Sequence, residues 1–190
     1  LSNGKAIAVG GYGIYKSTDF GENWTVKSSG IQSYTNVNQI HLYGDNEIYF
    51  TCSDNIFFRS YDSGIIWEML KFPGSYSIHS FDIDKKGNLF VGAGGNGVWK
   101  STDKGESWHS ATDTLRLSCV PSIGIDSNGV IYALSISGIY ISSDDGEFWQ
   151  KADNDFHGNL WNRFKVSKNN LLYGIFEREG GYENQLCFSD

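Results

Sequence analysis

The sequence predicts an all-β fold, a β-propeller built of four-stranded antiparallel blades. Three observations favour it: the composition, a motif that recurs at a near-constant interval, and four short apolar runs in each interval. The 190 residues include 12 Phe, 11 Tyr, 6 Trp and 23 Gly, but one Met. Aromatic residues fit a pleated strand surface, and the chain is poor in alanine and methionine, which favour helices.

An eight-residue motif, S-x-D-x-G-x-x-W, occurs at residues 17–24, 60–67, 101–108 and 142–149. Its serines lie 43, 41 and 41 residues apart, and an incomplete fifth copy occupies residues 186–190. Four fixed positions at this interval indicate a repeat protein. The motif positions are Ser17, Asp19, Gly21, Trp24, Ser60, Asp62, Gly64, Trp67, Ser101, Asp103, Gly105, Trp108, Ser142, Asp144, Gly146 and Trp149.

Each interval contains four short segments that we expect to be strands A to D, with the motif as the turn from C into D. The expected strands A are 39–42, 80–83, 123–126 and 163–166. The expected strands B are 6–10, 48–52, 89–93, 131–134 and 171–175, and the expected strands C are 13–16, 56–59, 97–100 and 138–141. Asn and Gly residues between A and B favour tight hairpins. Four strands in about 41 residues match a propeller blade of about 40–45 residues.

The chain enters at a strand B and leaves before a strand D, so residues 1–190 are expected to hold about four and a half blades of one partial propeller. We expect either a portion of a larger propeller or an open arc. The remaining blades would come from a longer chain or from other copies, because a blade needs neighbours to cover both of its faces.

The motif residues are expected to be structural. The aspartate accepts backbone amides within its own turn, the glycine adopts a backbone conformation that a side chain would obstruct, and the tryptophan packs beside strand C. Calcium binding and catalysis are the alternatives. The spacing is not that of an EF-hand loop, however, and an active site needs one set of groups rather than four. Asp82 and Asp126 occupy similar places on strand A of adjacent repeats, and we interpret them as structural too.

The octapeptide resembles the Asp-box, or BNR repeat, of sialidases, xyloglucan-degrading glycosidases, sortilin-type receptors and the photosystem II assembly factor family. This resemblance covers nearly the whole chain and implies the propeller fold. It also implies boxes at the blade periphery, away from the ligand face, and a secreted, cell-surface or periplasmic location. A sialidase would carry an arginine trio and Arg-Ile-Pro before its boxes, but neither Pro73 nor Pro121 follows Arg-Ile.

The end of each blade opposite the boxes carries the D–A and B–C connections, where function normally lies on a rigid scaffold. Aromatic, acidic and arginine side chains in these connections suit a glycan or a protein partner. The longest connection, residues 153–161, is the best single candidate. The ligand-face candidates are Tyr34, Tyr76, Arg116, Asp155, Phe156, His157, Trp161, Arg178 and Tyr182.

Other function classes find no support in the sequence. The formal net charge is −7, and no basic stripe of the kind that binds nucleic acid is present. No apolar run reaches the roughly 18 residues of a membrane span. The three cysteines have no metal spacing and are interpreted as buried small side chains, His79 has no partner in sequence, and neither a metal nor a cofactor is expected.

These observations favour a non-catalytic recognition scaffold that binds a glycan or a protein on the loop face. One alternative is a secreted glycoside hydrolase, xyloglucanase-like or sialidase-like, whose acidic pair lies partly outside this segment. Such an enzyme needs two carboxylates about 5–9.5 Å apart, and no catalytic residue can be assigned from the sequence. A second alternative is an assembly factor that docks a protein partner.

Overall fold

The structure is a computed structural model that describes residues 4–10, 13–26, 31, 37–52, 55–73, 76–112, 117, 119–152, 163–167, 172–178 and 181–188. Every regular element within these residues is a β-strand. The chain divides into two compact units, Leu1–Phe72 and Pro73–Asp190. Within the part of the chain that the structure describes, no helix has the length and apolar character needed to span a membrane.

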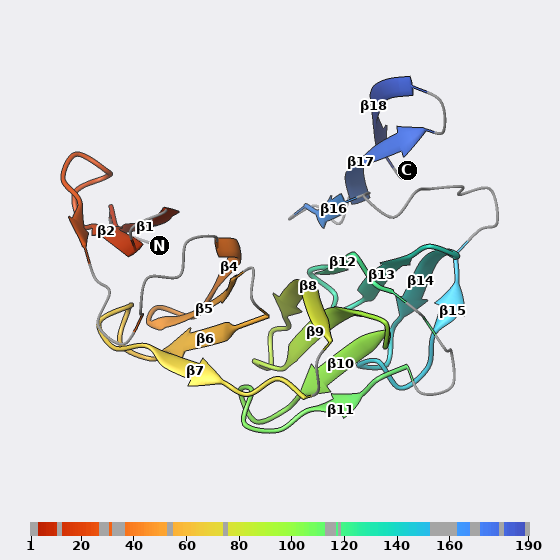
Figure 1. Ribbon diagram of the computed structural model, residues 1–190, viewed down its shortest axis with the longest axis horizontal. Helices are drawn as coiled ribbons and strands as arrows, with labels where there is room; N and C mark the ends of the chain where they lie inside the picture. The colour runs from red at the N-terminus through yellow and green to blue at the C-terminus, as the bar shows by residue number, and fades with distance from the viewer. Residues whose placement is uncertain are drawn as a thin grey trace. The chain divides into compact units, whose positions relative to one another are not determined.

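The first unit contains two antiparallel sheets (Figure 1). Blade 1 consists of β1 (Ala6–Gly10), β2 (Gly13–Ser17) and β3 (Thr25–Val26). Blade 2 consists of β4 (Val37–Tyr43), β5 (Glu47–Cys52), β6 (Phe57–Ser60) and β7 (Glu68–Leu70). In each sheet, strands that are consecutive in the chain are neighbours.

The second unit contains three such sheets. Blade 3 consists of β8 (Ser77–Ile83), β9 (Leu89–Gly94), β10 (Val98–Ser101) and β11 (His109–Ser110). Blade 4 consists of β12 (Ser122–Ile125), β13 (Ile131–Ser135), β14 (Gly138–Ser142) and β15 (Gln150–Lys151). Blade 5 consists of β16 (Arg163–Val166), β17 (Leu172–Arg178) and β18 (Gly181–Phe188).

The predicted fold class is confirmed. Among the described residues, sheets of three, four, four, four and three strands follow in the order that the repeat predicts. One connection was wrong: Arg178 and Tyr182 were expected in a connecting loop, but β17 extends to Arg178 and β18 begins at Gly181, with Arg178 paired to Gly181. Consecutive glycines at positions 180 and 181 favour a hairpin here.

Two A–B turns are closed by aspartates that follow strand A. Asp84 Oδ1 accepts the amides of Lys86 and Asn88, and Asp126 Oδ1 accepts those of Asn128 and Val130, all at 2.8–2.9 Å. Asp126 is therefore the counterpart of Asp84, and the expected equivalence of Asp82 and Asp126 is wrong.

Asp82 has a different role, because it connects two sheets. Its Oδ2 accepts the amide of Ile125 at 2.8 Å, so it joins β8 of blade 3 to the edge strand β12 of blade 4. β12 is an edge strand of its sheet, and the Asp82 carboxylate supplies an acceptor for one of its backbone amides.

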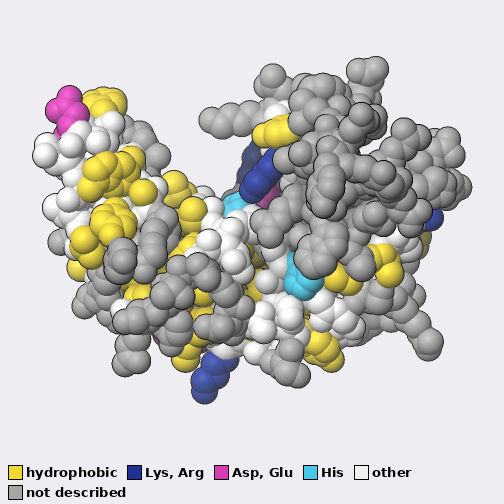
Figure 2. All heavy atoms as spheres, turned by 45° about the horizontal axis from the view of Figure 1, so that its top comes forward, with side chains coloured by type: hydrophobic (Ala, Val, Ile, Leu, Met, Phe, Trp, Pro, Cys, Tyr) yellow, Lys and Arg dark blue, Asp and Glu magenta, His cyan; other side chains and the backbone are white. Residues whose placement is uncertain are grey.

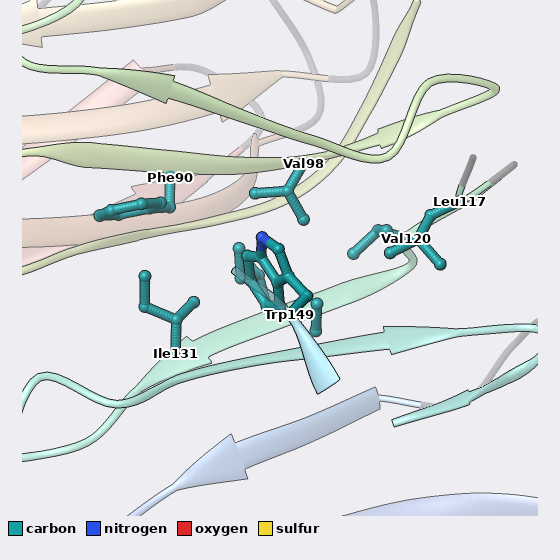
Figure 3. Packing of buried hydrophobic residues seen from close by; sticks show 8 residues of the cluster. Phe90, Val98, Leu117, Val120, Ile131 and Trp149 are labelled. Carbon is teal, nitrogen blue, oxygen red and sulfur yellow. The ribbon is translucent and has the colours of Figure 1, made fainter. Parts of the chain in front are cut away.

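The core of the second unit lies between blades 3 and 4. Figure 3 shows the indole of Trp149 enclosed by Phe90 and Val98 of blade 3 and by Ile131 of blade 4. The Trp149 Nε1–H donates both to Gly146 O in its own turn at 3.0 Å and to Ala111 O of blade 3 at 2.8 Å. The tryptophan of box 4 therefore packs against the preceding blade.

The same arrangement recurs in the first unit. Trp67 of blade 2 is 4% exposed and belongs to a cluster with Ile14 of blade 1 and with Ile48, Phe50 and Phe58 of its own blade. The ring of Phe50 meets the indole edge-to-face, with the ring centroids 4.8 Å apart. In these two blade pairs the box tryptophan thus closes one sheet against the sheet before it.

Box 1 differs from the predicted arrangement, because Trp24 is 43% exposed. Its indole still donates to Gly21 O at 2.9 Å, so its turn has the same internal geometry as the turns of boxes 2 and 4. The indole lacks the cover that an earlier sheet gives Trp67 and Trp149.

A lysine on strand C also joins neighbouring blades. Lys16 Nζ donates to Ser63 O at 3.2 Å, and Lys100 Nζ donates to Asp145 O at 2.8 Å. Ser63 and Asp145 occupy the same position, directly after the aspartate, in the box of the following blade. Lys86, in the A–B turn of blade 3, adds an ion pair to the Asp145 carboxylate.

We predict that Trp149→Ala lowers the free energy of unfolding by about 3–5 kcal/mol, because it removes a buried indole from between two sheets. Trp24→Ala is the matched control and should cost less than about 1 kcal/mol, because its indole is already open to solvent. Urea unfolding followed by circular dichroism measures both. Equal costs for the two variants would contradict the inter-blade role of Trp149.

Candidate binding face

The four boxes share one hydrogen-bonded core. In each box the serine Oγ–H donates to the aspartate Oδ1 at 2.7–2.8 Å and accepts the glycine amide at 2.7–2.9 Å. The aspartate Oδ1 also accepts the amide four residues further on, at 2.9–3.0 Å. The carboxylate is therefore engaged inside its own turn.

The residue after each box aspartate has a positive φ of 60–61°, although none of the four is glycine. These residues are Phe20, Ser63, Lys104 and Asp145. The following glycine also has a positive φ, between 84° and 93°. Left-handed backbone disfavours side chains, so the hydrogen bonds of the box must stabilise it.

Hydrogen bonds lower the pKa of the box aspartates. The Asn23 amide and carboxamide bring the pKa of Asp19 to about 2, and the Ser107 hydroxyl and amide do the same for Asp103. The Phe148 amide lowers the pKa of Asp144. At Asp62, partial burial raises the pKa, but the amides of Ile66 and Ile65 and the Ser60 hydroxyl outweigh it and leave a lowered value. These carboxylates stay ionised at neutral pH, unlike a general acid.

Most of the predicted ligand-face residues lie outside the part of the chain that the structure describes, namely Tyr34, Arg116, Asp155, Phe156, His157 and Trp161. Arg178 and Tyr182 lie on β17 and β18, and their side chains are not among the described ones. The side chain of Tyr76 is described. No cluster of three or more His, Cys, Asp or Glu suited to a metal occurs among the described residues.

Tyr76 lies in the D–A connection just before β8 and is 36% exposed. Its ring is tilted by 35° against that of Trp99 on β10, with the centroids 6.1 Å apart. Trp99 is half-buried. The two rings therefore form a partly open aromatic pair beside the loops of blade 3, a surface that can stack on a ligand.

The connection between blades 3 and 4 is held against β9. Val120 N donates to Ala93 O at 3.1 Å, and Cys119 forms an antiparallel bridge with Gly94. Leu117 and Val120 are buried in the core between the two blades. A Cβ on Gly92 would lie 2.5 Å from Val120 O, so the close approach of this connection requires glycine there.

The same connection brings together Cys119 and His79, which the sequence did not associate. The Cys119 Sγ lies 3.9 Å from His79 Nδ1, and burial raises the pKa of the thiol. The thiol thus stays protonated at neutral pH, unlike an activated nucleophile. The sequence did not indicate this pair, because 40 residues separate the two side chains. The residue that could have indicated it is Gly94, because its missing side chain leaves room for the His79 imidazole.

We predict that the free energy of unfolding falls as the pH is lowered from about 4 to about 2. Asp19 and Asp103 keep a pKa of about 2 in the folded chain, below the ordinary 3.8, so the unfolded chain takes up more protons in this interval. Urea unfolding at pH 5, 4, 3 and 2 measures the slope. Asp103→Asn should make the slope shallower, and an unchanged slope in this variant would contradict the assignment.

Gly92→Ala and Gly94→Ala form a matched pair of substitutions on β9. Gly92→Ala places its Cβ against the Val120 carbonyl and should destabilise the chain markedly, whereas Gly94→Ala meets the His79 ring, which can turn away. We expect a clear drop in melting temperature for Gly92→Ala and a smaller one for Gly94→Ala. The reverse order would show that residues 119–120 are not held as described.

Comparison with known proteins finds similarity in structure only. No family model and no curated protein sequence matches this chain. The GH74 xyloglucanase from Xanthomonas campestris matches with a TM-score of 0.71 and 16% identity over 97% of this chain and 33% of its own. YCF48 bound to D1 peptide matches with a TM-score of 0.68 and 18% identity over 100% of this chain and 62% of its own.

An auxiliary nutrient binding protein from Bacteroides ovatus matches with a TM-score of 0.65 and 12% identity, over 90% of this chain and 43% of its own. The chain thus spans about a third of the GH74 chain and under two thirds of YCF48. Identities this low establish the fold alone. The chain has the blade architecture of Asp-box-type β-propellers and corresponds to part of such a propeller.

Proposed function

We propose that this chain is a non-catalytic recognition module that binds a protein or a glycan through its D–A and B–C loops. The observation that carries the proposal is the state of the box aspartates. All four accept hydrogen bonds from their own turns and have a lowered pKa. The repeated aspartates of this chain therefore stabilise the turns of their own blades. Contacts with a partner then fall to the loops.

The loops of blade 3 supply the features that a binding surface needs. Residues 119–120 are hydrogen-bonded to β9, so the connection that they belong to has a fixed base. Tyr76 offers an exposed ring supported by Trp99. A preordered aromatic ring binds at low cost in conformational entropy, and tyrosine is frequent at the energetic centre of interfaces.

The test is a binding screen of the 190-residue chain against a peptide array and a glycan array that includes xyloglucan oligosaccharides. Tyr76→Ala should weaken the detected interaction about tenfold or more. Tyr173→Ala is the matched control, because Tyr173 is similarly exposed, at 39%, but lies on β17. Equal affinities for the two variants would remove Tyr76 from the site, and silence on both arrays would contradict the recognition role.

The glycoside hydrolase alternative is favoured by the structural similarity to the GH74 xyloglucanase. It requires a carboxylic acid with a raised pKa near a second carboxylate. Among the described residues, every carboxylate whose pKa departs clearly from its ordinary value is lowered. Release of reducing ends from xyloglucan by this chain would overturn the non-catalytic proposal. Export from the cytoplasm remains part of the proposal on the Asp-box resemblance.

A further inference from the structure

We propose that the exposed side of blade 1 is an interface for a preceding blade of a longer chain, which covers Trp24 and donates a basic side chain to box 1. Trp24, Phe20 and Val26 are 43%, 87% and 57% exposed. Figure 2 shows hydrophobic side chains at the surface of the N-terminal unit, at the left of the view. This proposal concerns blade packing and is independent of the ligand that the loops bind.

Two other blade pairs show what covers a box tryptophan. Trp67 packs with the buried Ile14 and the partly buried Ile7 of blade 1. Trp149 packs with Val98 and Phe90 of blade 3. Ile7 and Phe90 occupy equivalent positions on strand B, because Ile7 pairs with Lys16 and Phe90 pairs with Lys100. Ile14 and Val98 are equivalent on strand C, because each precedes its lysine by two residues.

A lysine two positions after the aliphatic residue of strand C makes a second contact with the next blade. Lys16 and Lys100 each donate to the carbonyl of the left-handed residue in the next box, Ser63 O and Asp145 O. The equivalent residue of box 1 is Phe20, which has the same φ of 61°. A preceding blade built alike would therefore place an ammonium group on Phe20 O.

Box 1 already has the conformation that the interface requires. Its indole donates to Gly21 O, as those of boxes 2 and 4 donate to Gly64 O and Gly146 O. The difference in burial, 43% exposed against 4%, thus comes from the neighbouring sheet and not from the turn.

These contacts specify the occupant. It is a four-stranded blade whose strand C ends in an aliphatic residue, any residue, a lysine and the box serine, as in Ile14–Ser17 and Val98–Ser101. The last sheet of a second copy fits less well, because Phe188 stands directly before Ser189, where Lys16 and Lys100 stand before their serines. The solved propellers that match this chain are also longer than it is, with room for further blades.

The experiment adds such a blade to the existing chain. Residues 77–130 contain blade 3, its connection and one further strand A, and a copy of them is fused directly to Ala6. The junction is matched because Ala6 and Ile131 occupy the same position of strand B: Ala6 pairs with Ser17, and Ile131 pairs with Ser142. The extended chain should melt at a higher temperature than the 190-residue chain. Trp24→Ala should lower its melting temperature by roughly 5–10 °C, against less than about 3 °C in the 190-residue chain.

Two controls make the result specific. Lys100→Met in the grafted copy alone should reverse part of the gain, and hydrogen exchange of the Gly21 and Asn23 amides should slow in the extended chain. No gain in melting temperature, or the same small cost of Trp24→Ala in both chains, would overturn the proposal. It would also be overturned if sedimentation showed that the 190-residue chain dimerises and that Trp24→Ala abolishes the dimer, because the occupant would then be a second copy.

Discussion

Burial of the box tryptophan between two sheets is the interaction on which the remaining structure depends. An indole removes about 150–250 Å² from water, which corresponds to roughly 4–6 kcal/mol at about 25 cal/mol per Å². Each neutral hydrogen bond of the box contributes about 1 kcal/mol net, and each hydrogen bond to the ionised aspartate about 1.5–3 kcal/mol. Burial of the ring and the hydrogen bonds of the turn therefore contribute comparable amounts at these corners. The hydrogen bonds determine where the ring goes, because they fix the turn from which Trp67 and Trp149 reach the preceding sheet.

Because burial of the ring and the shared hydrogen bonds of the turn involve only side chains at the fixed positions, the residue types between those positions can vary widely. The residue after the aspartate is Phe, Ser, Lys or Asp, yet all four have nearly the same φ. Its side chain differs in size and charge from box to box. What the two blade pairs joined by the lysines share is a hydrogen bond to its carbonyl. A backbone acceptor held at a constant place lets a lysine of the neighbouring blade bind without any requirement on that side chain.

The sequence predicted the strands well because their pattern is local and repeated. Each short apolar run had three or four counterparts, so that strand order and sheet composition followed from the interval alone. Interactions between distant residues could not be predicted in this way. Lys16 contacts a residue 47 positions away, Lys100 one 45 away, and the Cys119–His79 pair spans 40. These pairs depend on how blades are stacked, which the periodicity does not contain.

The candidate site was less predictable than the fold for the same reason. Loops do not repeat, so the sequence could rank their residues by chemical type but could not place them. Tyr76 was chosen as an aromatic residue in a connection, yet its significance comes from Trp99, a strand residue that no loop criterion selects. Gly92 carries a stronger signal. A glycine inside a strand has a cost in conformational entropy, so its presence indicates that another segment must approach closely, and Val120 is that segment. Interior glycines of the B strands are therefore a better guide to how the connections are held than the composition of the connections themselves.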